Sequence, residues 1–337
     1  MTKLSQTHSG GLATLAQPPK NPGLWSRTWP LLIGLMVTVS LVVASLFIGV
    51  YDLSSEGGRE MFFITRVPRT LALILSGASM AVVGLVMQLM TQNRFVEPST
   101  TGTIEWAGLG LILTYVFIPQ PSLMLRMIVA IVFAMIGTLI FFAFLQRVAL
   151  KSSLVVPIVG LMLGAVVGAV STFVALQTDM LQNLSIWFAG SFTGVTRGRY
   201  ELLWIVAATT ILVYFIADRF TVAGLGQEIA TSVGLNYRAV MLIGISIVAV
   251  TTGVVSVVVG SLPFLGLVVP NIVSMFRGDN LRSNLPWVVM VGIVVITLTD
   301  IIGRTLIMPF EIPVSMILGV LGATVFVYLI VRKGRRG

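Results

Sequence analysis

Long apolar segments recur along the whole chain, and this repetition constrains the fold more than any other feature. The hydrocarbon core of a bilayer is about 30 Å thick, so a helix needs about 20 apolar residues to cross it. Breaks at charged residues, prolines and glycine clusters divide the chain into about ten such segments. The predicted spans are 29–50, 70–90, 104–118, 123–145, 154–176, 202–216, 239–259, 262–275, 285–302 and 314–331. The sequence therefore predicts an all-α polytopic membrane protein with about ten transmembrane helices.

Three predicted spans are shorter than a full crossing requires, namely 104–118, 202–216 and 262–275. A short apolar helix crosses a bilayer only by local thinning, by interfacial ends, or as part of a broken helix that other helices cover. We expect broken, tilted or interfacial helices at these three places.

The composition agrees with a lipid environment and excludes several classes of function. Of the 337 residues, 56% are hydrophobic and 10% are charged, whereas a soluble domain has about a quarter charged residues. The chain has no cysteine, and its one histidine is His8. Disulfides, thiolate chemistry and cysteine-bound metals are therefore excluded, and we expect no metal site.

The net charge of +9 comes from 21 lysines and arginines against 12 acidic residues. Threading about ten spans from a cytoplasmic N-terminus places most of these basic residues in cytoplasmic segments, as the positive-inside rule requires. We therefore attribute the charge to membrane topology, with both termini in the cytoplasm, and not to nucleic-acid binding. Residues 1–28 lack an apolar face and are predicted to be a disordered tail before a permease domain over 29–334.

No catalytic motif occurs in the sequence. It contains no phosphate-binding loop of the GxxxxGK[ST] type, no HExxH, and no Ser/His pair within a span. We expect neither an enzyme nor a directly bound cofactor, so any ATP must be used by another chain.

Three charged residues lie near the ends of predicted spans, namely Glu105, Arg126 and Asp300. Charges inside a bilayer are costly and commonly mark a functional site or a paired structural group. Asp300 is followed four residues later by Arg304, which predicts a pair on one helical face. For Arg126 we favour anchoring or pairing at the interface. Glu105 fits either a cation or proton site of a secondary transporter or a packed polar group.

The segment 217–238 is the longest predicted cytoplasmic connection, and it contains a short amphipathic helix. Glu228 suits the first helical turn, and Gly234 suits a left-handed stop. Leu225, Ile229 and Val233 recur every four residues on one face. Such a face lies either on the lipid surface or in a groove of a partner protein.

A series of short motifs runs through the chain from about residue 30 to residue 334. In order, they are Arg66-Val67-Pro68-Arg69-Thr70-Leu71, Gly77-Ala78, Gly84 with Gln88, Asn93 and Pro98, Trp187 with Gly190-Ser191, Leu225-Gly226-Gln227-Glu228-Ile229-Ala230, Phe264-Leu265-Gly266-Leu267-Val268-Val269-Pro270, Gly278-Asp279-Asn280, Asp300 with Arg304, and Glu311-Ile312-Pro313-Val314. This series resembles the FecCD-type permeases, the membrane subunits of bacterial ABC importers for iron-siderophores, haem and cobalamin. The stretch 102–106 is most similar to the ferric-siderophore branch. One departure is Asn271 after Pro270, where the family often has histidine.

The resemblance implies a bundle like that of cobalamin-importer permeases (type II ABC importers) in the bacterial inner membrane. Two permease subunits, identical or homologous, would surround a central pathway above two cytoplasmic ATPase subunits. An extracytoplasmic binding protein would deliver a ferric siderophore and dock on Arg66, Arg69 and Arg304. The residues that the resemblance assigns to ATPase coupling are Leu225, Gly226, Gln227, Glu228, Ile229, Ala230, Val233 and Gly234. The alternatives are an ion-coupled secondary transporter that uses Glu105 and, less favoured, a membrane-bound enzyme.

Overall fold

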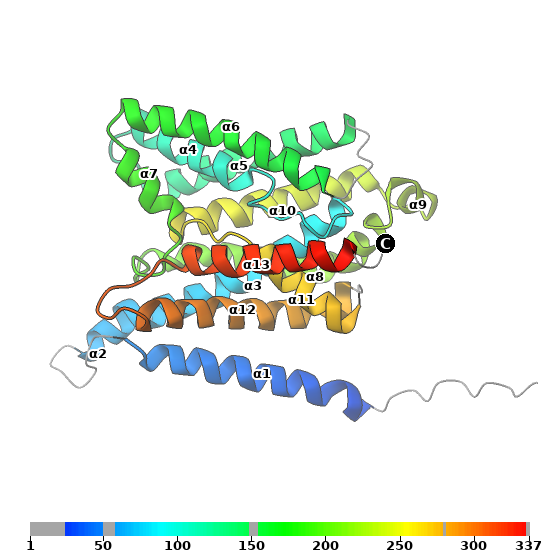
Figure 1. Ribbon diagram of the computed structural model, residues 1–337, viewed down its shortest axis with the longest axis horizontal. Coiled ribbons are helices and arrows are strands. Elements are labelled where there is room, and N and C mark those ends of the chain that lie inside the picture. Colours follow the sequence, from blue (N-terminus) through cyan, green and yellow to red (C-terminus); the bar gives the residue numbers. More distant parts are fainter. Residues whose placement is uncertain (1–23, 50–57, 148–153, 279–280, 335–337) are drawn as a thin grey trace, which may run out of the picture.

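The computed structural model describes residues 24–49, 58–147, 154–278 and 281–334, and the regular elements within these ranges are helices (Figure 1). Eight helical segments are long and apolar enough to cross a membrane, and two shorter apolar helices accompany them. The long helices are α1 (Leu24–Phe47), α3 (Val67–Met90), α5 (Leu123–Arg147), α6 (Val155–Gln177), α8 (Trp204–Ala223), α10 (Tyr237–Val258), α12 (Leu281–Thr305) and α13 (Val314–Gly334). The two shorter apolar helices are α4 (Thr103–Phe117) and α11 (Leu265–Arg277). Together they account for the ten predicted spans.

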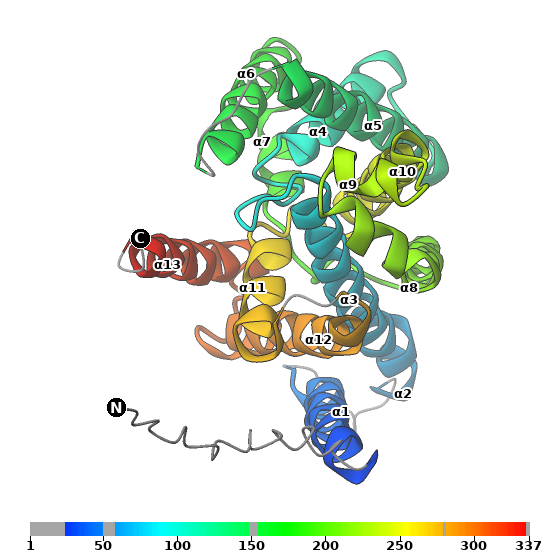
Figure 2. The same cartoon turned by 90° about the vertical axis from the view of Figure 1, so that its right-hand side faces the viewer.

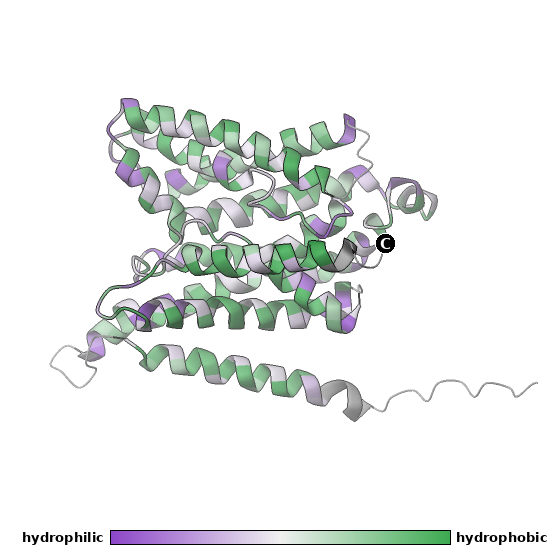
Figure 3. Cartoon of the chain, viewed as in Figure 1, coloured by the Kyte–Doolittle hydropathy of each residue, from purple (hydrophilic) through white to green (hydrophobic). Residues whose placement is uncertain are grey.

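The long helices lie side by side and share two ends (Figure 1). One end, here the α2 end, carries α2 (Gly58–Met61), the π-helical turn η1 (Phe62–Arg66) and the segment 306–313 before α13. The other, the α9 end, carries α9 (Gln227–Ser232) and the C-terminal end of α13. Hydrophilic residues gather toward the two ends, whereas the middle of the bundle is mainly apolar (Figure 3). This distribution is the one that a membrane-spanning bundle requires.

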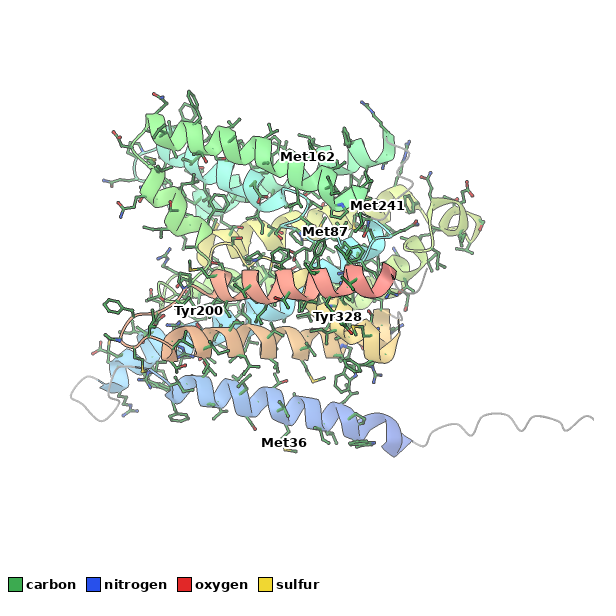
Figure 4. All side chains as sticks on the ribbon, viewed as in Figure 1. Met36, Met87, Met162, Tyr200, Met241 and Tyr328 are labelled. Atoms are coloured by element: carbon green, nitrogen blue, oxygen red, sulfur yellow. The ribbon has the colours of Figure 1, made fainter. Side chains whose placement is uncertain are left out.

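Helices α3 and α10 form the centre of the bundle, and α1 and α13 lie at its periphery (Figure 2). Met87 on α3 and Met241 on α10 are buried, whereas Met36 on α1 and Met162 on α6 are exposed at its surface (Figure 4). The short helix α7 (Leu181–Phe188) and the 3-10 turn η2 (Tyr200–Leu203) connect α6 to α8. The peripheral helices thus expose apolar side chains on the outside of the bundle, as a membrane-spanning bundle does.

Glycines let two pairs of segments approach at backbone distance. A Cβ atom added to Gly84 of α3 would lie 2.1 Å from the carbonyl oxygen of Gly266 in α11, which leaves no room for a side chain. On α6, Gly160 and Gly164 pack in the same way against residues 100–102, whereas Gly168 has nothing within 4 Å. Close helix approach through small residues is typical of membrane bundles.

Two sequence-based boundaries were wrong. The span predicted to be short at 202–216 is a full helix, because α8 continues to Ala223 and its Asp218 pairs with Arg282 of α12 at 2.5 Å. Both side chains are largely exposed, so these charges need not be buried and the helix continues past Asp218. Helix α1 begins at Leu24, within the predicted tail 1–28. The remainder of that tail lies outside the described residues.

Candidate functional site

A cluster of charged side chains lies at the α2 end, where α3 begins and α12 ends. Arg69 of α3 donates hydrogen bonds from Nη2 to Oδ1 of Asp300 at 2.7 Å and to Oε2 of Glu311 at 2.8 Å. Its Nη1 also donates to Oε1 of Glu311 at 3.0 Å. Arg69 therefore bridges α12 to the segment 306–313 that follows it. Charge-assisted contacts of this two-pronged kind fix the orientation of both partners.

Asp300 is shared between two arginines. Its Oδ2 atom lies 2.8 Å from Nη2 of Arg304, one helical turn further along α12, which is the pair that the four-residue spacing predicts. The Asp300 side chain is fully inaccessible to solvent. A buried carboxylate needs such cationic partners, because burying an unpaired charge carries a large desolvation cost.

The outer part of the cluster holds the end of α1. Arg304 donates from Nη1 to the carbonyl oxygen of Ile48 at 2.7 Å and from Nη2 to the hydroxyl of Ser45 at 2.7 Å. Arg66 donates from Nη1 to the carbonyl oxygen of Leu46 at 3.2 Å. The last carbonyl groups of a helix lack partners within the helix, so these two arginines cap the C-terminus of α1.

The structure thus brings together all three arginines that the sequence analysis selected for docking, namely Arg66, Arg69 and Arg304. Each of them is also engaged within the chain. A cavity of about 280 Å³ lies elsewhere, toward the α9 end, while a cavity of about 210 Å³ opens between these arginines. The cavity at the arginines is lined by Ile48, Gly49, Thr65, Arg66, Arg69, Phe192, Thr193, Val195, Arg304 and Glu311.

Glu311 is the member of this cluster that the sequence analysis quoted only as part of a motif. Burial raises the pKa of this carboxyl group, but the hydrogen bonds from Arg69 and Thr193, together with the positive charges of Arg69 and Arg304, outweigh burial and hold the pKa below its usual value. The Thr193 hydroxyl donates to Oε2 at 2.6 Å. Glu311 is therefore the ionised partner of Arg69 at neutral pH. An acidic residue just after a predicted outward span end could have indicated it.

The predicted amphipathic helix is present at the α9 end as α9. Glu228 lies in its first turn, and Gly234 after it has a φ of +83°, the left-handed conformation expected of a helix stop. Leu225, Ile229 and Val233 are exposed at 59%, 49% and 67%. The remaining predicted coupling residues occupy the same turn, with Gly226 preceding α9, Gln227 beginning it and Ala230 buried on its inner side.

Two glutamates lie in the interior near α4. The Oε2 atom of Glu105, in the first turn of α4, is buried and has no hydrogen-bond partner among the described residues, and the carboxyl group faces Gly164 of α6. Glu97, which the sequence analysis did not select, lies in the segment 91–102 and is fully buried. Its Oε1 atom accepts a hydrogen bond from the backbone N–H of Phe264 at 2.7 Å.

Arg126, at the start of α5, has a pairing role, which is the interpretation that the sequence favoured. Its Nη1 atom donates to the Tyr115 hydroxyl at 2.6 Å, and the Tyr115 ring stacks on Trp187 with centroids 4.8 Å apart. Within the described residues no group of three or more acidic or histidine side chains could hold a metal ion.

A multi-pass bundle with paired buried charges, two short apolar helices and a short amphipathic helix at one end is typical of a membrane transport protein. Comparison with known proteins makes the assignment specific. Residues 30–332 match the FecCD transport family, and the chain belongs to that family. The predicted resemblance is therefore confirmed, as is the prediction of a transport subunit rather than an enzyme.

Relatives and solved structures agree with this assignment. The petrobactin import system permease protein FatD of Bacillus anthracis is 57% identical over 92% of both chains. The petrobactin import system permease protein YclN of Bacillus subtilis is 41% identical over 88% of this chain and 96% of its own. A solved metal-chelate type ABC transporter in an inward-facing conformation has a TM-score of 0.78 at 24% identity, covering 90% of this chain and 99% of its own. This last likeness confirms the predicted fold class.

Proposed function

We propose that this chain is the permease subunit of an ATP-driven importer that carries a ferric siderophore across the bacterial inner membrane, with ferric petrobactin as the first candidate substrate. The observation that carries the proposal is the 57% identity, over 92% of both chains, to a petrobactin import permease. A second petrobactin permease at 41% identity supports the same substrate. The chain itself binds no ATP in this proposal, because its sequence has no phosphate-binding loop.

The α9 end faces the cytoplasm in this proposal, and the α2 end faces outward. The positive-inside rule supports this orientation, because threading the predicted spans from a cytoplasmic N-terminus puts 14 of the 21 lysines and arginines in cytoplasmic segments and the other 7 outside. Both chain termini then lie in the cytoplasm.

Two cytoplasmic ATPase subunits would contact the permease dimer through α9. The apolar residues Leu225, Ile229 and Val233 are exposed on a helix that projects from the bundle end (Figure 1). An apolar helix face inserted into a groove of another protein is a common mode of recognition. Closure of the ATPase subunits on ATP would move α9, and α9 is joined to α8 and α10 by short connections. A second permease subunit, identical or homologous, would complete the pathway.

A binding protein would dock at the α2 end, on the cluster of Arg66, Arg69 and Arg304. Three arginines against two acids, Asp300 and Glu311, leave this surface positive around a cavity of about 210 Å³. A positive cavity attracts acidic residues of a partner and speeds encounter. Because all three guanidinium groups already have partners within the chain, docking must add to or replace these contacts.

An uptake assay with iron-55 tests the proposed substrate. A strain that lacks this permease should lose uptake of ferric petrobactin and regain it when the intact chain is supplied. Uptake of ferric citrate through other systems should stay unchanged in both strains, and it serves as the control. Retained petrobactin uptake in the deletion strain, with its other petrobactin systems also removed, would contradict the assignment.

A further inference from the structure

Arg69 has two acidic partners that differ in how firmly the fold holds them. The Asp300 side chain is wholly buried on α12, and it also pairs with Arg304. The Glu311 side chain is 28% exposed and lies outside the helices, in the segment 306–313. Asp300 is therefore a fixed partner of Arg69, whereas Glu311 can leave through a movement of its own segment.

Glu311 also ties together three parts of the α2 end. Its carboxylate accepts hydrogen bonds from Arg69 of α3 and from the hydroxyl of Thr193, in the segment between α7 and η2. The segment that carries Glu311 is further attached by the bond from the Ile312 N–H to the carbonyl oxygen of Gly303 at 2.9 Å. Loss of the Glu311 contacts would free this segment from α3 while its attachment to α12 remained.

The same segment exposes an apolar surface beside the arginine cavity. Four of its residues are large, hydrophobic and at least half exposed, namely Leu306, Ile307, Met308 and Phe310. Exposed apolar residues next to a charged cavity are typical of a surface that binds another protein. The partner that fits this surface presents a carboxylate to the cavity and apolar side chains around it.

We propose that Glu311 occupies, within the undocked chain, the place of a carboxylate from the binding protein, and that docking exchanges the two acids on Arg69. The exchange releases Glu311 and with it the segment 306–313 at the mouth of the pathway. This inference rests on the proposed docking role of Arg66, Arg69 and Arg304.

Electrostatics favours an exchange over simple addition. Two carboxylates on one face of Arg69 repel each other, so an incoming acid gains most when Glu311 turns away. With Glu311 displaced, three arginines face one remaining acid, Asp300, and the cavity attracts the incoming carboxylate more strongly. The exchange leaves Arg69 with two acidic partners, Asp300 and the incoming carboxylate, and the released Glu311, whose side chain is 28% exposed, passes to solvent and not into a buried site.

The test uses the complete transporter in lipid nanodiscs, with its ATPase subunits and its binding protein. The quantity measured is the concentration of binding protein that gives half of the maximal ATPase stimulation. Glu311→Gln removes the competing charge, so this concentration should fall by about fivefold, the effect of one partly exposed ion pair. The matched control is Glu201→Gln, which removes a carboxylate that accepts from the backbone N–H of Gly198 at the same end. It should leave the half-saturating concentration near the wild-type value.

A second variant keeps the test decisive if Glu311→Gln does not fold. Thr193→Val removes one hydrogen bond to Glu311 and leaves every charge in place, so it should shift the concentration in the same direction by a smaller factor. If the Glu311→Gln complex assembles, an unchanged or raised half-saturating concentration overturns the exchange. If the Glu311→Gln complex does not assemble, the same result in Thr193→Val overturns it.

The charge-reversed variant Arg66→Glu/Arg69→Glu separates this outcome from failure of docking itself. If the double variant assembles with wild-type basal ATPase but loses stimulation, while Glu311→Gln behaves like wild type, the docking surface stands and the exchange is wrong. If the double variant keeps wild-type stimulation, the docking surface is wrong, and the exchange is overturned with it.

Discussion

Glu97 accepts a hydrogen bond at 2.7 Å from the backbone N–H of Phe264, and this contact joins the non-helical segment before α4 to the one before α11. Glu97 lies between α3 and α4, and Phe264 immediately precedes α11. The Ser99 hydroxyl also donates to the Glu97 carboxylate. Asn271 of α11 adds a second link, because its Nδ2 atom donates to the carbonyl oxygen of Arg94 at 2.8 Å. The segment 91–102 and α11 are thus held together.

Burial raises the pKa of Glu97 from 4.5 to about 7, against the opposing effect of hydrogen bonds from Ser99 and from the backbone N–H groups of Phe264, Gly266 and Leu267. The folded chain therefore binds this proton more tightly than the unfolded chain. Stability falls as the pH rises from about 4.5 to about 7, and the fall stops once the folded form also loses the proton.

We predict that Glu97→Gln removes this pH dependence. Glutamine keeps an oxygen that accepts from the Phe264 N–H but carries no proton to lose. The stability advantage of the variant over wild type should grow as the pH rises from about 4.5 to about 7, to roughly 3 kcal/mol at most. Thermal unfolding of the purified permease across this pH range measures the effect, with the exposed Glu201→Gln as the control. Parallel pH profiles of wild type and Glu97→Gln would count against a buried, titrating Glu97.

The Asp300 pair predicts a strong effect on stability. Asp300→Asn leaves Arg69 and Arg304 without their shared anion in a buried site, and breaking such a pair commonly costs about 3 to 5 kcal/mol. Asp218→Asn breaks an exposed pair with Arg282 and should cost about 1 kcal/mol or less. The midpoint of thermal unfolding in detergent compares the two variants. Equal midpoints would show that the buried cluster contributes no more than a surface pair.

The spanning helices could be predicted from the sequence because a bilayer imposes one simple requirement, a long apolar run. The short helices α4 and α11 were indicated by their short apolar runs. Helix α8 was not predicted at its full length, because hydropathy treats Asp218 as a stop whether or not a partner such as Arg282 lies beside it. The local sequence pattern around a residue contains no information on partners that come from another helix.

The same limit explains the site residues. The spacing of Asp300 and Arg304 on one helix predicts their pair, whereas the contacts of Arg69 with Glu311 and of Glu97 with Phe264 join residues far apart in the chain. The sequence selected Arg66, Arg69 and Arg304 as docking residues. It could not indicate that Arg66 and Arg304 also cap the end of α1. Residues with such internal roles become visible only when the helices are packed.

The proposed orientation predicts opposite labelling of the two ends. Gln120, between α4 and α5 at the α2 end, and Ser232, at the end of α9, are both exposed. Ser55, another position suited to such a test, lies outside the described residues. Because the chain has no cysteine, Gln120→Cys and Ser232→Cys each provide a single labelling site. An impermeant thiol reagent added to intact cells with a permeable outer envelope should label Gln120→Cys only, and labelling of both variants would overturn the topology.

Glu105 separates ATP-driven import from ion-coupled transport. A proton-coupled mechanism requires a group that changes charge during the cycle, and Glu105 is a buried carboxyl group available in α4. In an ATP-driven importer, Glu105→Gln should keep most of its ATP-dependent uptake in proteoliposomes, and a proton gradient without ATP should drive none. Uptake driven by the gradient alone, and lost in Glu105→Gln, would favour the secondary transporter.

The exposed stripe of α9 predicts a specific coupling defect. Ile229 lies at the centre of the stripe between Leu225 and Val233 and is 49% exposed. If this face is buried in an ATPase subunit, Ile229→Asp places an unpaired charge in an apolar contact, and a central anchor of this kind contributes about 2 kcal/mol or more. Uptake should therefore fall roughly tenfold or more.

The control for this variant is Thr231→Asp, which places the same charge on another face of the helix, two residues from Ile229. Thr231 is exposed and its hydroxyl donates within α9, to the carbonyl oxygen of Gln227 at 2.7 Å. Uptake, ATPase rate and the amount of ATPase subunit that co-purifies are measured for both variants. Loss of uptake in Ile229→Asp with near wild-type uptake in Thr231→Asp supports the stripe as the contact, because the added charge is the same. Equal behaviour of the two variants would mean that α9 does not present this face to the ATPase.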